Sequence, residues 1–356
     1  GVQTCALPIY TSVNATTVLS TVDSHVTFDA AINNTGAAAQ NLTINAGEGN
    51  VTFKGAVGAT GVNGPLGALV INSEGETKFV STVDAASLKT DVDTANINVN
   101  AATNKVTIQG GRITTIGEQQ FAELVVLDNA SHDTVLNTAN SNVTFDKAIV
   151  NASATAQDLT INAGTGDVMF TGAVGEDING ASGALGHLVI NSAGDTTFVS
   201  TVDAASVKTD VDSAINVNAL ANQVTIQGGR ITTTGEQHFA ELVLLDNASH
   251  ATVLNTSNSP VTFDKAIVNA NATAQDLTIN AGTGHVTFTG AVGEDSNGTN
   301  GALGHLVINS AGETKFVSTV DAASLLTDVD AAHIDVNAAT NKVTIQGGRI
   351  TTTGEQ

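Results

Sequence analysis

Residues 42–53 read LTINAGEGNVTF, and the order of apolar and polar residues in this stretch decides the fold. Leu42 and Ile44 alternate with Thr43, which is the period-two pattern of a half-buried β-strand. Asn45 and the Gly residues after it favour a tight turn, and VTF then forms a second alternating triplet. The same phrase returns as LVINSEGETKF at residues 69–79 and as INVNAATNKVTI at residues 97–108. We therefore predict short β-strands joined by tight turns.

A longer repeat contains these phrases. The string QGGRITT recurs at Gln109, Gln227 and Gln346, and VTFD recurs at Val26, Val143 and Val261, so one unit has 117 to 119 residues. We divide the chain into a partial first copy (approximately 10–126), a second copy (127–244) and a truncated third copy (245–356). The sequence starts inside one unit and stops inside another. We therefore expect cut ends with unpaired strand edges, and end-to-end self-association through them.

The first nine residues, GVQTCALPI, match the translation of a common short-read sequencing adapter residue for residue. We exclude residues 1–9 from the fold as a non-native segment. The only cysteine, Cys5, lies in this segment. The remaining residues, 10–356, therefore offer no disulfide framework and no thiolate metal site.

The spacing of equivalent strands indicates how they are stacked. Strand starts in the first copy lie 27 and 28 residues apart, at Leu42, Leu69 and Ile97. About five coils per unit give roughly 24 residues per coil, which is typical of repeat solenoids. We predict an all-β, right-handed parallel β-helix that continues through residues 10–356. The alternative is a string of tandem β-sandwich domains, but such domains normally have an aromatic-rich core, and aromatic residues make up only 3% of this chain.

Charge and hydropathy exclude two classes of partner. The chain has 12 basic and 34 acidic residues, for a formal charge of −22, which repels phosphate backbones. We expect no nucleic-acid partner. No apolar run approaches the roughly 18 residues of a membrane helix, so we expect no membrane span in this chain.

Four phrases carry a resemblance to a known family: LTINAGTG, VTFTGAVG, LGHLVINSAG and ITTTGEQHF. They resemble the passenger repeats of filamentous-haemagglutinin-like and autotransporter adhesins, and the likeness covers residues 10–356. The resemblance implies a right-handed parallel β-helix, secretion across the outer membrane and a location at the bacterial cell surface. It also implies adhesion to a host or neighbouring cell through a glycan or protein ligand.

An Asn follows the first strand of each phrase and is a candidate structural residue. Stacked Asn side chains at a coil corner can pair amide to amide; the alternative is a turn former without such pairing. The positions are Asn45, Asn72, Asn100, Asn162, Asn191, Asn218, Asn280, Asn309 and Asn337.

An acidic phrase in each copy is the candidate metal site. It reads TVDAAS, two variable residues, then TDVD, and its carboxylates suit a hard cation such as Ca²⁺. The spacing matches no known calcium loop, so a solvated acidic turn is the preferred interpretation. The calcium candidates are Asp84, Asp91, Asp93, Asp203, Asp210, Asp212, Asp321, Asp328 and Asp330.

One arginine in each copy precedes a glutamate by six residues, and we predict a salt bridge between them. The pairs are Arg112 with Glu118, Arg230 with Glu236, and Arg349 with Glu355. Histidines are replaced by other residues in at least one copy, as His187 and His305 are by Ala68 and His238 is by Gln120, which argues against catalysis or metal binding. We predict no enzyme and no cofactor, but the structural shaft or adhesive region of a secreted adhesin. The alternative function is a carbohydrate-active β-helix enzyme, such as a polysaccharide lyase or hydrolase.

Overall fold

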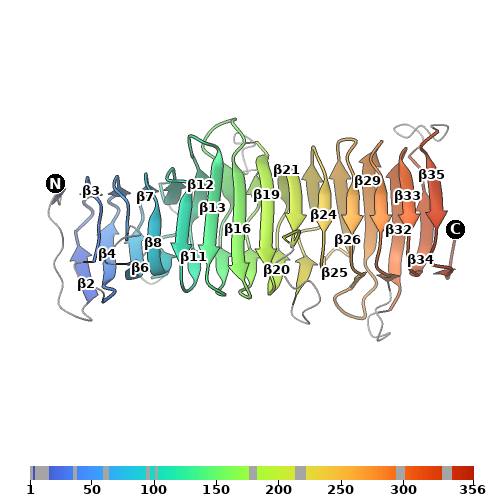
Figure 1. Ribbon diagram of the computed structural model, residues 1–356, viewed down its shortest axis with the longest axis horizontal. Coiled ribbons are helices and arrows are strands. Elements are labelled where there is room, and N and C mark those ends of the chain that lie inside the picture. Colours follow the sequence, from blue (N-terminus) through green and yellow to red (C-terminus); the bar gives the residue numbers. More distant parts are fainter. Residues whose placement is uncertain are drawn as a thin grey trace. The chain divides into compact units, whose positions relative to one another are not determined.

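The computed structural model describes residues 3–4, 16–34, 38–58, 64–93, 97–100, 103–175, 183–212, 222–293, 301–330 and 339–356. The chain divides into two compact units, Gly1–Leu185 and Gly186–Gln356. The described residues form 36 β-strands and no helix, and the strands within each unit stack in parallel as a β-solenoid (Figure 1). The predicted all-β solenoid fold is confirmed.

The strands of the first unit have the following bounds: β1 (Gln3–Thr4), β2 (Thr16–Ser20), β3 (Val26–Phe28), β4 (Asn41–Gly47), β5 (Val51–Phe53), β6 (Leu66–Ser73), β7 (Glu76–Phe79), β8 (Val83–Thr90), β9 (Lys105–Ile108), β10 (Arg112–Thr115), β11 (Gln119–Phe121), β12 (Leu124–Leu127), β13 (Asp133–Thr138), β14 (Val143–Phe145), β15 (Ile149–Asn151), β16 (Asp158–Gly164), β17 (Val168–Phe170) and β18 (Val174–Gly175).

The strands that follow have these bounds: β19 (Leu185–Ser192), β20 (Asp195–Phe198), β21 (Val202–Thr209), β22 (Gln223–Ile226), β23 (Arg230–Thr233), β24 (Gln237–Phe239), β25 (Leu242–Leu245), β26 (Ala251–Thr256), β27 (Val261–Phe263), β28 (Ile267–Asn269), β29 (Asp276–Gly282), β30 (Val286–Phe288), β31 (Val292–Gly293), β32 (Leu303–Ser310), β33 (Glu313–Phe316), β34 (Val320–Thr327), β35 (Lys342–Ile345) and β36 (Ile350–Thr352).

Alternation along each strand divides inward from outward side chains. In β4, Leu42 and Ile44 are buried while Thr43 is half-buried. The same alternation holds in β16 and β29, the equivalent strands of the other copies. The aliphatic residues therefore point into the coil, and the period-two pattern predicts these faces correctly.

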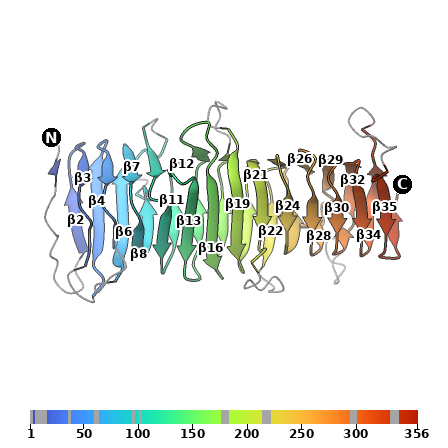
Figure 2. The same cartoon turned by 45° about the horizontal axis from the view of Figure 1, so that its top comes forward.

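Three parallel sheets run along the first unit. The first contains β2, β4, β6, the second half of β8, β11, β14 and β17. The second contains β3, β5, β7, β9, β12, β15 and β18. The third contains β10, β13 and β16, and begins with bridges through Ile32, Val57 and Val83. Strands β2, β4 and β6 lie side by side in both views (Figure 1 and Figure 2).

Equivalent residues of successive copies do not lie in the same sheet. From Leu42, five rungs of the first sheet lead to Val168, whose counterpart in the first copy is Val51 of the second sheet. The rungs are Leu42, Leu69, Leu88, Gln119, Val143 and Val168. One repeat therefore moves its sequence on by one sheet.

The other two sheets show the same displacement. Five rungs lead from Val51 to Val174, and four lead from Val57 to Ile161. A position that moves through all three sheets, one sheet per repeat, therefore crosses five, five and four rungs. The mean is four and two-thirds coils per repeat of 117 residues, or about 25 residues per coil. The prediction of about five coils per repeat is close, and the missing third turns each copy onto a new face.

The Phe side chains report this displacement directly. Phe28, Phe53 and Phe79 stack in the second sheet, with ring centroids 5.1 and 5.2 Å apart and interplanar angles of 9° and 14°. Their counterparts in the second copy, Phe145 and Phe170, stack in the first sheet together with Phe121 from the end of the first copy, with both centroid distances at 5.3 Å. Few aromatic residues therefore suffice for the core, because each ring packs on an identical ring one coil away.

The QGG string recurs because two adjacent positions tolerate only glycine. A Cβ atom on Gly110 would lie 2.0 Å from the carbonyl oxygen of Ser81 in the preceding coil. Its neighbour Gly111 has φ +68°, in the left-handed region that side chains disfavour. The same close approach occurs at Gly228 and Gly347.

We expect Phe145→Ala to lower the free energy of unfolding by about 3–5 kcal/mol, since it removes the middle ring of a buried stack and leaves a cavity. Urea denaturation followed by circular dichroism measures the change. The matched control is Thr144→Ala on the same strand, a half-buried outward side chain, which should change stability by no more than about 0.5 kcal/mol. Equal effects of both substitutions would contradict the assigned inward face.

Candidate functional site: the polar corners of the coils

Asn side chains at the strand ends form amide-to-amide pairs across coils. Asn72 Nδ2 donates to Asn45 Oδ1 at 2.8 Å, and Asn45 Nδ2 donates to Ser20 Oγ at 3.3 Å. In the third copy, Asn309 donates to Asn280 at 2.8 Å, and Asn280 donates to Asn255 at 2.8 Å. The predicted Asn ladder is therefore present at these corners.

The remaining predicted Asn positions differ from one another, and only some of them join the ladder. Asn162 donates to Asn137 at 2.8 Å, while the buried Asn191 ends β19 as Asn72 ends β6. Asn100 departs from the ladder: it lies in a turn, where its backbone N–H donates to Asn98 Oδ1 at 3.1 Å. Asn218 and Asn337 lie outside the described residues.

Asn137 and Asn255 belong to the ladder although the sequence analysis missed them. Each ends a TVLN phrase, in which Thr replaces the first aliphatic residue of LTIN. Thr134 and Thr252 are nevertheless buried. Both LTIN and TVLN have an inward residue, an outward residue, a second inward residue and then Asn. This pattern would have identified Asn137 and Asn255 if Thr had been accepted at the first inward position.

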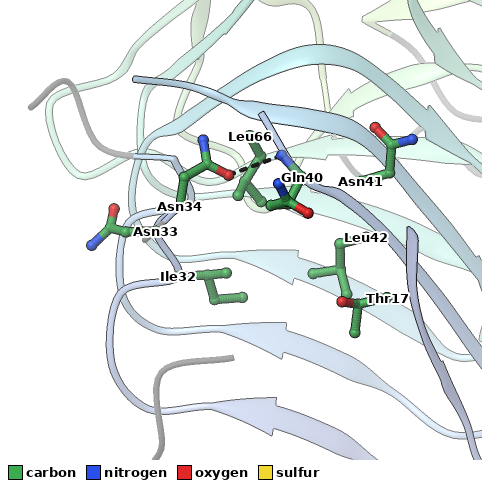
Figure 3. Close-up of a pocket in the computed structure, with 8 residues that line it drawn as sticks. All are labelled: Thr17, Ile32, Asn33, Asn34, Gln40, Asn41, Leu42 and Leu66. Atoms are coloured by element: carbon green, nitrogen blue, oxygen red, sulfur yellow. Dashed lines mark hydrogen bonds between the residues drawn. The ribbon is translucent and has the colours of Figure 1, made fainter. Parts of the chain in front are cut away.

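A second kind of Asn corner was not predicted. Asn34 is 3% exposed, accepts the backbone N–H of Gln40 at 3.0 Å and donates to the carbonyl oxygen of Pro65 at 2.6 Å (Figure 3). It lies beside a cavity of about 20 Å³, which is room for one water molecule. Asn151 and Asn269 make the equivalent bonds in the other copies. Each side chain thus connects two consecutive coils.

The predicted partner of the arginines is wrong. Arg112 binds Asp84 through two hydrogen bonds of 2.8 and 2.9 Å, and not Glu118. Glu118 instead pairs with Lys89 at 2.6 Å. The cross-strand register explains the difference, because β10 lies against the first half of β8 and β11 lies against its second half. Asp84 also raises the pKa of Arg112, chiefly through the side-chain hydrogen bonds.

The same correction applies to the other copies. Arg230 forms two hydrogen bonds of 2.8 Å with Asp203, and Glu236 pairs with Lys208. Arg349 donates to Asp321 at 2.9 Å, while Glu355 accepts the backbone N–H of Leu325 through its carbonyl oxygen. The first aspartate of each calcium phrase is therefore held by a guanidinium group.

The second aspartate of the phrase lies inside the coil. Asp91 is 1% exposed, and its Oδ1 accepts the backbone N–H of Ser73 at 2.7 Å. Glu123, on the next coil, is fully buried, and its Oε2 accepts the Thr90 hydroxyl at 2.9 Å. Burial, followed by the charge of Asp91, raises the pKa of Glu123 well above its usual range. Burial also raises the pKa of Asp91 to about 7.

The second copy contains the same pair. Asp210 is 3% exposed and accepts the Ser192 N–H at 2.7 Å, and Glu241 is 1% exposed. Burial raises the pKa of Asp210 to about 6 and, with the charge of Asp210, that of Glu241 to about 8. The buried glutamates were missed because FAELVVL and FAELVLL look like apolar strands. A Glu repeated between apolar neighbours was the available signal.

The acidic phrase does not gather into one cluster. Asp84 is the second residue of β8, Asp91 follows the last residue of this strand, and Asp93 lies two residues further on. Asp212 is exposed, Asp328 accepts the Ser310 N–H at 2.9 Å, and the Asp330 N–H donates to Asn309 at 3.3 Å. Among the described residues, no three or more His, Cys, Asp or Glu side chains lie close enough to hold a metal ion.

At two positions one copy has a histidine where another has Gln or Asn, and both residues make the same hydrogen bond. His238 bonds Asp264 at 2.8 Å, where Gln120 in the preceding copy bonds Asp146 at 3.3 Å. His285 Nδ1 accepts the Glu313 N–H at 2.8 Å, as Asn50 Oδ1 accepts the Glu76 N–H at 2.9 Å. Both histidines serve as structural hydrogen-bond partners between coils.

The chain matches no protein-family model, no curated protein and no solved structure. Within the part of the chain that the structure describes, no helix has the length and apolar character needed to cross a membrane. What the chain does must therefore be argued from the repeated corners themselves.

We expect Asn280→Ala to lower the free energy of unfolding by about 1–3 kcal/mol, because it leaves the Asn255 acceptor and the Asn309 donor without their partner. Urea denaturation is again the measurement. Asn271→Ala is the control: Asn271 is exposed and bonds Asp246, so its loss should cost no more than about 0.5 kcal/mol. A cost for Asn280→Ala as small as this would show that the ladder contributes nothing.

We expect Arg112→Gln to cost about 2 kcal/mol, because Asp84 is 4% exposed and would lose two charge-assisted hydrogen bonds. Lys89→Gln removes the same charge from the more exposed pair with Glu118, and should cost below about 1 kcal/mol. The two variants are compared by denaturation in low and high salt. A larger loss of stability for Lys89→Gln than for Arg112→Gln would contradict the conclusion that the buried Asp84 is the important partner of Arg112.

Proposed function

We propose that this chain is a stretch of the shaft of a large secreted bacterial adhesin, displayed at the outer surface of the cell and without catalytic activity. The observation that carries the proposal is the set of contacts made by the charged residues that would be the first candidates for catalysis. In all three copies the arginine binds the aspartate of the preceding coil. An active site needs one converged set of groups in a cleft, whereas these residues repeat the same structural contact.

The variation between copies supports the same proposal. Residues differ at outward positions, as at Gln120 in β11 and His238 in β24, and this replacement keeps the hydrogen bond. Most buried Phe, Leu, Ile and Val residues of equivalent strands agree, and an exception such as Leu88, which is Val207 in the second copy, remains aliphatic. A spacer needs a regular coil and places few demands on its outward positions, so this pattern fits a shaft.

The adhesive contact is proposed to lie with a glycan or protein of a host or neighbouring cell. Under this proposal the repeats set the distance between the cell and that contact. The formal charge of −22 keeps a long β surface soluble. Nothing in the proposal requires each copy to bind a ligand.

Deletion of residues 26–142 from the full-length gene tests this proposal. These residues make up one repeat, so His25 would be joined to Val143, the counterpart of Val26. Four and two-thirds coils at roughly 4.8 Å each give an expected shortening of about 22 Å. We expect a shorter filament in electron microscopy, with normal export and unchanged attachment of the cells.

The matched control deletes residues 26–84, which is half a repeat and joins strands that are not equivalent. We expect this variant to misfold and to be lost from the surface. Complete loss of attachment by the one-repeat variant, with normal export, would show that the segment is itself the adhesive site. Depolymerisation of a polysaccharide by the purified chain would contradict the absence of catalysis.

A further inference from the structure

The buried carboxyl pairs, Asp91 with Glu123 and Asp210 with Glu241, have no evident structural reason within a passive coil. Placing a carboxylate in a core costs several kcal/mol unless a partner neutralises it. Asp84, which is also buried, instead meets Arg112. The compensation at the buried pairs must come from another source.

The groups that face the first pair are all named by its contacts. Ser73 N–H and the Asn104 amide face Asp91, together with the like charge of Glu74. The Thr90 hydroxyl and the N–H groups of residues 122 and 123 face Glu123. No basic side chain is among these described neighbours, so the pair is not neutralised by an ion pair.

One oxygen of each carboxyl group in the first pair remains free for a further contact. Asp91 Oδ2 and Glu123 Oε1 are buried and accept no hydrogen bond from the described residues. Both carboxyl groups lie at the end of β8 and of β11, which are neighbouring strands of the first sheet. Two buried carboxyl groups on neighbouring strands, with no basic side chain among their described neighbours, need a proton or a cation to offset their charge.

A divalent cation does not fit this corner. Ca²⁺ needs six to eight oxygen ligands, and the described residues contain no cluster of three or more acidic or His side chains. A proton needs only one free oxygen. It neutralises one carboxyl group of the pair and leaves one negative charge for the Ser73, Asn104 and Thr90 donors.

We propose that each buried Asp–Glu pair binds one proton, and that this proton stabilises the packing of neighbouring coils in a pH-dependent way. The second copy repeats the arrangement. Asp210 and Glu241 are faced by Ser192 N–H, the Asn222 amide, the Thr209 hydroxyl and the N–H groups of residues 240 and 241. Both oxygens of Glu241 accept no hydrogen bond from the described residues by distance and angle.

The sign of the pH dependence follows from the raised pKa values. Between the ordinary carboxyl pKa near 4.5 and the raised values, the folded pair holds a proton that the unfolded chain has lost. Stability is therefore fully present below about pH 4 and falls as pH rises through the window up to about pH 8. Each pair should raise the unfolding equilibrium constant by up to about tenfold per pH unit in that window.

Unfolding of the whole chain by urea at pH 5, 6, 7 and 8 tests the proposal in a Glu123→Gln/Glu241→Gln variant. Gln has nearly the shape of Glu but stays uncharged at all of these pH values, so the variant should show a much flatter pH dependence and exceed the wild type in stability at pH 8. The control is Glu118→Gln/Glu236→Gln, which removes the same charge from exposed pairs with Lys89 and Lys208. The control should keep the steep wild-type dependence.

A second measurement decides the matter if the glutamine variant fails to fold. In wild-type chain labelled with ¹³C at the Glu carboxyl carbons, we expect two resonances to titrate far above the others. Titration of every Glu carboxyl near pH 4.5 would overturn the proposal, as would a glutamine variant with the wild-type pH dependence. An increase in wild-type stability at pH 8 on addition of CaCl₂, absent from the variant, would also overturn it in favour of a metal ion.

Discussion

The spacing of the parallel ladder is the constraint on which this structure depends. Hydrogen bonding sets neighbouring strands about 4.8 Å apart, so every side chain meets the side chain one coil above and below it. Like residues can satisfy this spacing well: Phe rings stack 5.1 to 5.4 Å apart, and Asn amides bond at 2.8 Å. Charged residues gain nothing by stacking on their own kind, and Asp84 and Glu118 instead meet the opposite charge, while Asp91 and Glu123 are buried as a carboxyl pair.

The local features of the fold were predictable from the sequence because they depend on neighbours in the chain. Leu42 and Ile44 point inward as their alternation with Thr43 requires, and the recurrence of QGG follows from close approach at Gly110. The Asn corners were predictable where the LTIN pattern is intact. They were missed at Asn137, where Thr134 takes the inward position of an aliphatic residue.

Features that depend on the register between coils could not be predicted. Arg112 lies 28 residues from Asp84 and only six from Glu118, and only the pairing of β10 with the first half of β8 brings the distant partner into contact. Strand β8 belongs to two sheets, since Val83 pairs with Ile113 while Leu88 pairs with Gln119. Equally, only this register buries Glu123 beside Asp91, because a single Glu in FAELVVL gives no sign of which coil it will face.

The repeat of four and two-thirds coils has a genetic consequence. Recombination between near-identical copies joins equivalent positions, so gain or loss of a copy always leaves a continuous coil. The distal part of the solenoid is then turned by a third of a revolution about its axis, and three such events restore the original orientation. Because each sheet accepts the strands of the other two, as β4 and β16 show by occupying the first and third sheets, these changes leave the core packing intact. Copy number can thus drift within a population while the fold of every descendant remains the same.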